Sequence, residues 1–387
     1  MRRMPSLSRA VAVLAAVSLL ACSGSSSTTD AGSGGGAGGG SGGGATGGGS
    51  GGGATGGGSG GGATGGGSGG GVTGGGTGGG LAGLFSQPHG WNKDVSALAP
   101  SSRSQAIIDA LIALGGWGNG NKLQTDFSLI VLRANAATPR RTITAASGYC
   151  YGGPDCDALP MQMPIPANGN TEGSADYTCD TANNDCHVLV VEETERQLYE
   201  LYQATGNASS FTSYAAFVWD LDKQYPETLR GDQCTSADAA GLPMAALIPT
   251  ADEVAAGTIP HALRFILPNA RMKRQVYVRP ATHAGGPSST NPDAPPYGVR
   301  FRLKASFDET PFNASERVVL KALKTYGMIL SDGGNIALTF SDDRLSTAKW
   351  ATLGITPQSF NNIPVSAFEV VDLGAEIPLT YNCVRNP

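Results

Sequence analysis

His187-Val-Leu-Val-Val-Glu192 and Gln197-Leu-Tyr-Glu-Leu-Tyr202 are two short, largely apolar runs separated by four residues. Their length and their β-branched and aromatic side chains are typical of β-strands, whereas amphipathic helices are longer and repeat every 3.6 residues. We therefore expect a pair of strands here. Further strands are expected at Phe127–Arg133, Arg141–Ala145, Ala215–Leu221, His261–Leu267, Gln275–Val278, Val299–Phe307, Gly327–Ser331, Ile336–Phe340 and Phe368–Val371.

Helical patterns are few. A helix is expected after Ser101, a short one at the Thr250–Glu253 capping box, and a third after Ser315. Asp332-Gly333-Gly334 predicts a tight hairpin between two of the strands. Because strands and helices do not alternate along the chain, a parallel α/β fold is disfavoured. The sequence predicts a mainly β fold, a β-sandwich or jelly-roll-like domain of two packed sheets with a few short helices.

The N-terminus has the pattern of a bacterial export signal. Three arginines within the first nine residues precede the apolar stretch Ala10–Ala21, which is too short to span a bilayer as a helix. It ends at Leu19-Leu20-Ala21-Cys22, a lipobox pattern, in which the cysteine takes a diacylglycerol thioether and becomes the mature N-terminus. We expect residues 1–21 to be a lipoprotein signal peptide and Cys22 to be the lipidation site. An ordinary secretory signal with an incidental cysteine is the alternative.

Residues 22–82, which begin with Cys22, are expected to form a disordered linker. From Ser23 to Gly80 the chain is nearly all Gly, Ser, Thr and Ala, and a nine-residue unit repeats with polar residues at 41, 50, 59, 68 and 77. Such a segment has no apolar surface to offset the entropy of ordering. A Gly-rich coil of 58 residues spans roughly 40 Å. The linker would therefore hold a single globular domain, residues 83–387, away from the membrane.

Composition limits the partners. Removal of the signal peptide takes away three arginines and no acidic residue, which leaves 23 basic against 31 acidic side chains and a net charge of −8. An acidic chain argues against nucleic acid as a partner. Matches to Gly-x-Ser-x-Gly and Gly-x-Gly-x-x-Gly fall within the linker, without the flanking strand and helix that give those motifs meaning, so no cofactor is indicated.

The same features predict where the protein lies. We expect a monomeric, extracytoplasmic protein that is anchored to a bacterial membrane by the lipid on Cys22. No stretch after the signal peptide is long and apolar enough to span a bilayer. Ser23, in place of the Asp that retains lipoproteins in the inner membrane, favours the outer membrane and the cell surface.

Six cysteines remain besides Cys22. An even number in an exported chain predicts three disulfides, although sequence alone allows many pairings. We expect Cys150–Cys156 and Cys179–Cys186, because each pair closes a short loop rich in turn residues, and Cys234–Cys383 would then tie the C-terminus to the middle of the domain. A zinc site is the competing interpretation, but no Cys-x-x-Cys motif is present. The acidic residues between 176 and 185 match no calcium-loop spacing, so no metal site is indicated.

The richest polar cluster contains two closely spaced acids. Strand alternation would place Asp220 and Asp222 on one face, and glycosidic bond cleavage requires two carboxylates, one acid and one base or nucleophile. Asp220 and Asp238 are therefore candidate catalytic residues, and Trp219 and Arg230 are candidate substrate-binding residues. The alternative is a solvent-exposed strand end, with Asp238 capping the residues after it.

Two histidines and a basic strand face complete the candidate set. His261 precedes an apolar strand, and His283 lies in a loop, where binding residues are often found. A histidine can abstract the C5 proton of a uronate while a cation neutralises the carboxylate, which is the chemistry of a lyase. Both histidines are candidate catalytic residues. Arg302 and Lys304 share one face of a strand and are candidate residues for binding an anionic sugar, the alternative being a solvated face.

Several short segments between residues 84 and 376 are similar in sequence to segments of known exported proteins. These segments are Phe85–Val95, His187–Val191, Leu198–Tyr202, Thr235–Pro243, Glu253–Gly257, His261–Phe265, Arg302–Phe307 and Leu323–Leu330. Together they resemble a family of exported proteins seen in actinobacteria and myxobacteria. The resemblance implies one exported domain and no mechanism, because the family has no assigned activity. The cysteine-rich insert at residues 150–186 departs from the family's pattern.

These observations favour a surface-anchored lipoprotein that acts on an extracellular polysaccharide, by hydrolysis or elimination. The alternative is a non-catalytic carbohydrate-binding or adhesion module that uses the same aromatic and basic side chains. Convergence of Asp220, Asp238, His261 or His283 in one cleft would favour the enzyme. Dispersal of these side chains over separate parts of the domain would argue against it.

Overall fold

The computed structural model describes residues 83–207 and 210–386. Eighteen short strands and five short α-helices lie in this part of the chain, which confirms a mainly β fold with few helices. The predicted signal peptide, Cys22 and the Gly-rich linker lie outside the described residues. No helix that the structure describes has the length and apolar character needed to cross a membrane.

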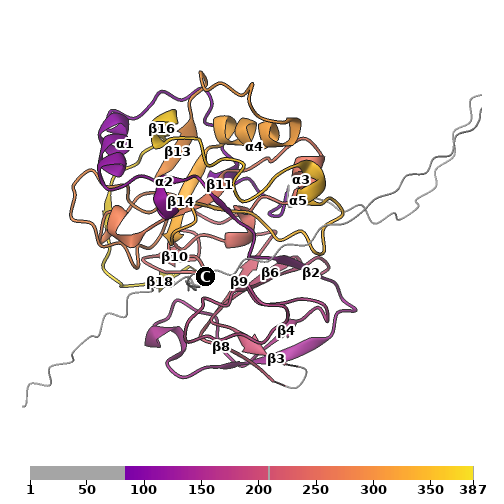
Figure 1. Ribbon diagram of the computed structural model, residues 1–387. Helices are drawn as coiled ribbons and strands as arrows, with labels where there is room; N and C mark the ends of the chain where they lie inside the picture. The colour runs from indigo at the N-terminus through magenta and orange to yellow at the C-terminus, as the bar shows by residue number, and fades with distance from the viewer. Residues whose placement is uncertain (1–82, 208–209, 387) are drawn as a thin grey trace, which may run out of the picture. The chain divides into compact units, whose positions relative to one another are not determined.

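The largest sheet has six strands. In spatial order they are β1 (Thr125–Asp126), β15 (Leu338–Thr339), β11 (Leu263–Leu267), β14 (Met328–Gly333), β13 (Arg300–Leu303) and β16 (Phe368–Val371). The sheet is mixed, since β11 runs parallel to β14 while β13 is antiparallel to both of its neighbours. Helix α1 (Ser104–Ala113) packs against β16 and helix α4 (Ala314–Thr325) against β13, and Figure 1 shows both helices beside this sheet.

The main hydrophobic core lies on this sheet. Phe265 on β11, Phe301 on β13 and Phe368 on β16 are buried together with Trp117. The ring of Trp117 lies between 5.4 and 6.3 Å, centroid to centroid, from these three rings. Such edge-to-face and tilted contacts are favourable beyond the area that they bury. One aromatic cluster therefore joins three strands that are far apart in the sequence.

A second sheet contains the two apolar runs at residues 187–192 and 197–202. Its order is β2 (Val131–Ala134), β5 (Val188–Glu192), β6 (Gln197–Tyr202) and β9 (Ala215–Asp220). β5 and β6 pair antiparallel, from Val188 opposite Leu201 to Glu192 opposite Gln197. Every residue of β5 is buried, which explains why Val188–Val191 is continuously apolar rather than alternating.

The remaining strands form smaller sheets. β4 (Met161–Pro164), β3 (Arg140–Ala145), β8 (Phe211–Ser213) and β7 (Thr205–Gly206) make a four-stranded sheet, and Figure 1 shows β3, β4 and β8 away from α1 and α4. Two-stranded pairs are formed by β10 (Gly231–Asp232) with β18 (Val384–Arg385), and by β12 (Val276–Tyr277) with β17 (Ile377–Pro378). The other helices are α2 (Gly118–Asn121), α3 (Ala251–Ala255) and α5 (Trp350–Leu353), and short 3-10 turns cover Gly90–Asn92, Tyr149–Gly152, Met244–Ala246, Asn269–Arg271 and Val365–Ala367.

Three details differ from the sequence-based expectation. The described strands divide among five sheets rather than two. The hairpin at Asp332-Gly333-Gly334 is wrong, because β11 lies between β14 and β15 and pairs with both. Turn residues indicate that the chain reverses direction, but they do not indicate which strands will pair. Here β11 lies between the two strands that the turn connects and pairs with each of them. Helix α4 is capped by Asn313, whose side chain accepts from the Glu316 N–H, rather than by Ser315, whereas the Thr250–Glu253 capping box is confirmed.

The three expected disulfides are present: Cys150–Cys156, Cys179–Cys186 and Cys234–Cys383. Every cysteine in the described residues is therefore oxidised, which contradicts the zinc alternative. Three disulfides indicate an oxidising, extracytoplasmic environment. Cys234–Cys383 joins residues that are 149 apart in the sequence and fixes the C-terminal strand β18 beside β10.

Candidate functional site

A pocket of about 110 Å³ lies where β9, the loop after it and the C-terminal strand β18 meet. We call it the arginine pocket. Three of its lining side chains are cationic, and none is a carboxylate. The lining residues are Val218, Lys223, Tyr225, Leu229, Arg230, Arg385 and Asn386.

Arg230 is the buried member of this set. Its side chain is 4% exposed, and Nη2 donates to Asp157 Oδ2 at 2.8 Å and to the Asp155 carbonyl oxygen at 3.3 Å. Nε and Nη1 are buried and have no hydrogen-bond partner in the described part of the chain. The guanidinium lies 5.0 Å from the ring centroid of Phe217 and 5.5 Å from that of Trp219. Burial lowers the pKa of Arg230, and the Asp157 carboxylate opposes that shift.

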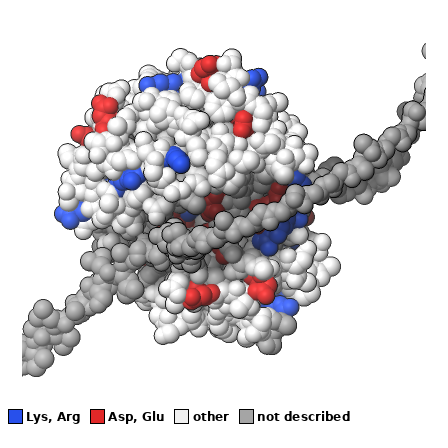
Figure 2. Space-filling model, in the orientation of Figure 1, with Lys and Arg blue, Asp and Glu red and all other residues white. Residues whose placement is uncertain are grey.

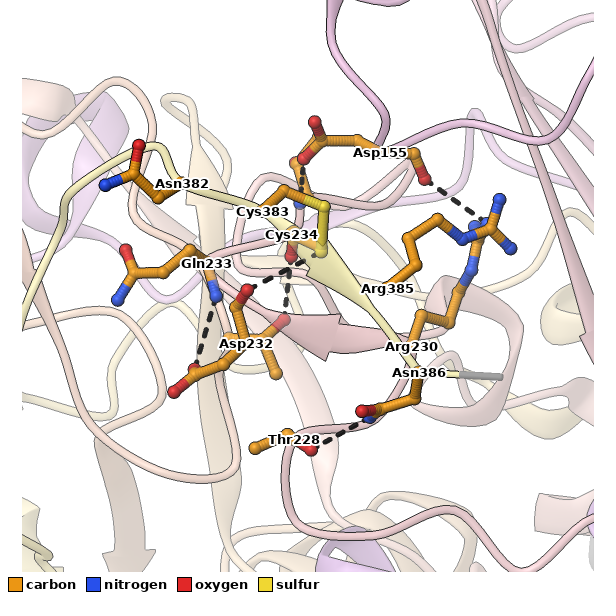
Figure 3. The surroundings of a disulfide bond; sticks show 12 residues. Asp155, Thr228, Arg230, Asp232, Gln233, Cys234, Asn382, Cys383, Arg385 and Asn386 are labelled. Atoms are coloured by element: carbon orange, nitrogen blue, oxygen red, sulfur yellow. Dashed lines mark hydrogen bonds between the residues drawn. A yellow bond between two sulfur atoms is a disulfide. The ribbon is translucent and has the colours of Figure 1, made fainter.

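Arg385 reaches the same carboxylate from the other end of the domain's sequence. Its Nη2 donates to Asp157 Oδ1 at 2.7 Å and its Nη1 to the Cys156 carbonyl oxygen at 3.0 Å. Figure 3 shows Arg230 and Arg385 next to each other, on one side of the Cys234–Cys383 disulfide. Lys223 adds a third cation, with Nζ 5.4 Å from the Tyr225 ring centroid. Positive charge therefore exceeds negative charge at the pocket wall, which suits an anionic ligand.

Aromatic side chains pack against Tyr225, which lines the pocket. Trp219 is fully buried, and its ring centroid lies 5.3 Å from that of Tyr225. The Asp220 N–H donates to the Tyr225 hydroxyl at 2.9 Å, which fixes the tyrosine at the pocket wall. His89 packs edge-on against Tyr225 with 6.0 Å between ring centroids. These contacts hold the loop after β9 in one position.

The structure brings three of the predicted site residues together. Trp219 and Asp220 end strand β9, and Arg230 follows the loop that begins there. Asp220 is exposed, and its Oδ1 accepts from the Asp222 N–H at 2.9 Å. Its carboxylate therefore caps the turn after β9, which is the strand-end alternative drawn from the sequence.

Asp238 lies in a different, fully buried network. Its carboxylate is 0% exposed and pairs with Arg264, whose Nη2 is 3.0 Å from Asp238 Oδ1 and 2.9 Å from Asp332 Oδ2. Burial raises the pKa of Asp238, and Arg264 opposes this. Burial also raises the pKa of Asp332 to about 7. This network binds strands β11 and β14 to the segment after β10.

His187 belongs to the same buried region. Its Nδ1 is 2.7 Å from Glu172 Oε2, and its Nε2 is 3.1 Å from the Ala237 carbonyl oxygen. Both partners accept hydrogen bonds, so both ring nitrogens carry protons and the ring is cationic. Burial by itself lowers the pKa of His187, but the Glu172 carboxylate more than offsets this and the pKa rises to about 9.

The two candidate catalytic histidines lie apart from the arginine pocket. His261 is 3% exposed, its Nε2 is 3.4 Å from Glu253 Oε1, and its Nδ1 is 2.8 Å from the Ala262 carbonyl oxygen. His283 is half-buried; its Nδ1 is 3.0 Å from the Ala239 carbonyl oxygen, and burial lowers its pKa. Neither histidine lines the pocket. The convergence of Asp220, Asp238, His261 and His283 that would favour an enzyme is not seen among the described residues.

The basic strand face is covered at Arg302, whereas Lys304 is half-buried. β13 lies between β14 and β16, and Arg302 is 6% exposed. Arg302 pairs with Glu369 at 2.6 Å and donates to the carbonyl oxygens of Val95, Ser96 and Leu98. Lys304 donates to the Ser366 carbonyl oxygen at 2.8 Å. Arg302 therefore fastens the N-terminal segment to the sheet, and neither side chain lines the pocket.

Several residues in or next to the pocket were not found from the sequence. Asp157 and Arg385 lie 228 residues apart, in a cysteine-rich loop and in the last residues of the chain, and no spacing links them. The one available signal was the pair Cys234 and Cys383, since each cysteine lies within four residues of a pocket arginine. Asp155 also lies within 4.8 Å of both sulfurs, but the disulfide leaves no thiolate to bind a metal there.

Comparison with known proteins adds no further assignment: neither family models, nor the curated proteins, nor the solved structures gave a match. The protein is therefore placed by its own features, as a mainly β, disulfide-bonded, extracytoplasmic domain with an arginine pocket. The resemblance to exported actinobacterial and myxobacterial proteins stays a prediction. Figure 2 shows one face of the molecule, on which acidic and basic side chains are scattered rather than gathered in a patch of one sign.

Proposed function

We propose that this protein is a lipid-anchored, surface-exposed binding protein whose domain holds an acidic extracellular polysaccharide, with a carboxylate of the polymer in the arginine pocket. The observation that carries the proposal is the state of Arg230. A guanidinium that is 4% exposed and leaves Nε and Nη1 without partners is costly in the free protein. A bound anion offsets that cost.

The size of the pocket favours one charged group of a larger ligand. A volume of about 110 Å³ admits a few atoms beyond a carboxylate and leaves the rest of the ligand outside. A planar carboxylate matches the hydrogen-bonding geometry of a guanidinium. Lys223 lines the same pocket and supplies a further cation. A polymer that carries repeated carboxylates, such as a uronate chain, has this chemistry.

The predicted anchor supports a target outside the cell. Three disulfides indicate an extracytoplasmic location. The lipobox at Cys22 and the Gly-rich linker, both inferred from the sequence, would hold the domain at a distance from the membrane of roughly tens of ångströms. Capsule, cell wall or external polymer lies at that distance.

Binding without turnover fits the dispersed acid and base residues better than hydrolysis or elimination. Asp238 is buried in an ion pair with Arg264, and His261 is buried beside Glu253. Of the four candidate catalytic residues only Asp220 lies beside the pocket wall. An enzyme would need a positioned acid and base at the anion. Turnover of the polymer by the wild-type protein would instead establish the lyase or hydrolase alternative.

The test is a titration of the full-length chain with a galacturonate oligomer, and with a galactose oligomer of the same length as the neutral comparison. We expect saturable binding of the acidic oligomer only. Lys223→Gln should weaken binding about tenfold, the loss of one charge-assisted contact. Lys321→Gln, at an exposed position on α4, is the matched control and should bind like the wild type.

Two results would overturn the proposal. One is equal affinity for the acidic and neutral oligomers. The other is an equal loss of binding in Lys223→Gln and Lys321→Gln, which would show that binding depends on the net charge of the protein and not on the pocket. The release of reducing ends or of unsaturated products is followed in the same samples to detect turnover.

A further inference from the structure

We infer that the arginine pocket is complete only when the Cys234–Cys383 disulfide is formed, so that the binding site is assembled by oxidation after export. This inference rests on the proposed function, since it concerns how that site is built. The two cysteines touch no ligand; they are positioning residues for Arg230 and Arg385.

The position of the disulfide supports this role. Cys234 follows Arg230 by four residues, and Cys383 precedes Arg385 by two. Figure 3 shows the disulfide between the two chain segments that carry these arginines. A backbone hydrogen bond also joins the two segments, since the Asn386 N–H donates to the Arg230 carbonyl oxygen at 2.8 Å. The covalent bond therefore fixes the register of the two segments that form the wall of the pocket.

The C-terminal segment is held by hydrogen bonds, such as those from Arg385 and Asn386, and by little apolar burial. Strand β18 has two residues, and it pairs only with the two residues of β10, Gly231 opposite Arg385 and Asp232 opposite Val384. Tyr381 is 66% exposed and Val384 74% exposed, so they bury little apolar area. A chain end with so little burial frays when nothing ties it down. The Cys234–Cys383 disulfide adds a covalent constraint to these hydrogen bonds.

Close backbone packing makes the site sensitive to the position of the strand. A Cβ on Gly231 would lie 2.3 Å from the Val384 carbonyl oxygen and 2.7 Å from the Cys234 sulfur. No side chain fits there, and the two segments touch through backbone. A shift of β18 would carry Arg385 away from Asp157, to which it now donates at 2.7 Å.

Loss of the disulfide changes the charge at the pocket. When β18 is released, the wall loses Arg385 and Asn386, and Asp157 keeps Arg230 and the Val218 N–H as partners. One cation fewer then faces a bound carboxylate, and Arg230 is more nearly neutralised. Affinity for the anion should fall by at least about tenfold, and it should become less sensitive to salt.

A small dithiol can reduce the Cys234–Cys383 disulfide by thiol–disulfide exchange. Reduction breaks the sulfur–sulfur bond, and the two sulfurs take up two electrons and two protons from the dithiol, which becomes a cyclic disulfide. Formation after export is the reverse exchange, with an oxidised thiol–disulfide protein as the electron acceptor. Cys234 is 1% exposed whereas Cys383 is half-buried, so exchange begins at Cys383. Before export, under reducing conditions, the pocket would be incomplete.

The test compares the full-length chain with two double variants. Cys234→Ser with Cys383→Ser removes this disulfide, and Cys179→Ser with Cys186→Ser removes a disulfide of another loop as the matched control. Affinity for the galacturonate oligomer is measured at low and high salt, well below the unfolding temperature, together with near-ultraviolet circular dichroism. We expect the first variant to lose at least about tenfold in affinity and the control to lose none.

A third variant separates positioning from general stability. Arg385→Gln keeps the disulfide, and it should reproduce both the loss of affinity and the reduced salt dependence seen without the disulfide. If the wild type does not bind the oligomer, the proposed function fails. If the wild type binds and the Cys234/Cys383 variant binds equally well, or if the control variant loses as much, the inference is overturned while the proposed function stands.

Discussion

Arg230 and Arg385 donate to opposite oxygens of one carboxylate, Asp157, at 2.8 and 2.7 Å. Two guanidinium groups side by side repel each other, and the charge of Arg385 adds to the effect of burial in lowering the pKa of Arg230. A single carboxylate cannot offset both charges, and two nitrogen atoms of Arg230 remain without partners. The shared carboxylate therefore leaves an excess of positive charge at the arginine pocket, which favours the binding of an anion.

Replacement of Arg385 by Gln should weaken anion binding more than it lowers stability. The side chain is 33% exposed, so loss of its ion pair should change the free energy of unfolding by about 1 kcal/mol or less. Affinity for the acidic oligomer should fall about tenfold. Calorimetric titration and urea denaturation of the same variant measure the two effects, and a variant that loses stability without losing affinity would contradict this prediction.

Asp157→Asn should have opposite effects on stability and on binding. Arg230 would be left buried without a charged partner, which costs about 3–5 kcal/mol of unfolding free energy. The pocket would lose its internal anion, so added carboxylate should raise the unfolding temperature of the variant by more than that of the wild type. Thermal melts with increasing galacturonate oligomer test this; equal shifts for both proteins would show that Asp157 does not compete with the ligand.

Asp238→Ala should lower stability and leave binding intact. The carboxylate is 0% exposed and pairs with Arg264, so its removal leaves a buried cation short of a partner, at a cost of about 3–5 kcal/mol. Denaturation measures the loss. Affinity for the acidic oligomer, measured at a temperature where the variant is folded, should match the wild type, whereas a specific loss of binding or turnover would restore Asp238 as a candidate site residue.

His187 should make the protein less stable as the pH rises from neutral to alkaline. Its pKa is about 9 in the folded protein against 6.5 ordinarily, so the folded state holds the proton more tightly between these values. The stability that it contributes is fully present below about pH 6.5 and is lost as the pH rises through about 9. The slope from this one group approaches about 1.4 kcal/mol per pH unit.

His187→Gln, which cannot be protonated, supplies the comparison for that prediction. Between about pH 6.5 and 9, the unfolding free energy of this variant should fall less steeply with pH than that of the wild type. The difference in slope should be at most that of one titrating group, about 1.4 kcal/mol per pH unit. Urea denaturation across this range measures both slopes. Identical slopes would mean that the ring of His187 is neutral in the folded protein.

Much of the architecture was accessible from the sequence. The runs at 187–192 and 197–202 became β5 and β6, and Phe368–Val371 became β16 with unchanged bounds. The three disulfides pair as predicted. The strands and two of the disulfides depend on short-range pattern, such as an apolar run or a short loop between cysteines, and local pattern is what a sequence displays directly. Cys234–Cys383, whose residues are 149 apart, was the pair that remained.

The candidate site was less accessible, and two residues show why. Arg302 was a candidate for binding an anionic sugar, with a solvated face as the alternative, but β13 is an inner strand and Arg302 is paired with Glu369 on β16. Arg385 received no role, because its partner Asp157 lies in an insert far from it in the sequence. Alternation along a strand tells which side chains share a face, and it does not tell what covers that face.

Composition, strand-length apolar runs and the even number of cysteines were enough to predict the class of protein, a mainly β, disulfide-bonded, exported domain with a predicted lipid anchor and linker, because these features can be read without knowing which segments meet. The packing of distant segments decided which charges meet. It buried Asp238, Arg264 and Arg302 in ion pairs, left Arg230 with unpaired nitrogens, and brought Arg385 to Asp157 through the Cys234–Cys383 disulfide. The physical reason is that the free energy of a charge depends on its burial and on its neighbours, and both are fixed only when distant segments pack together.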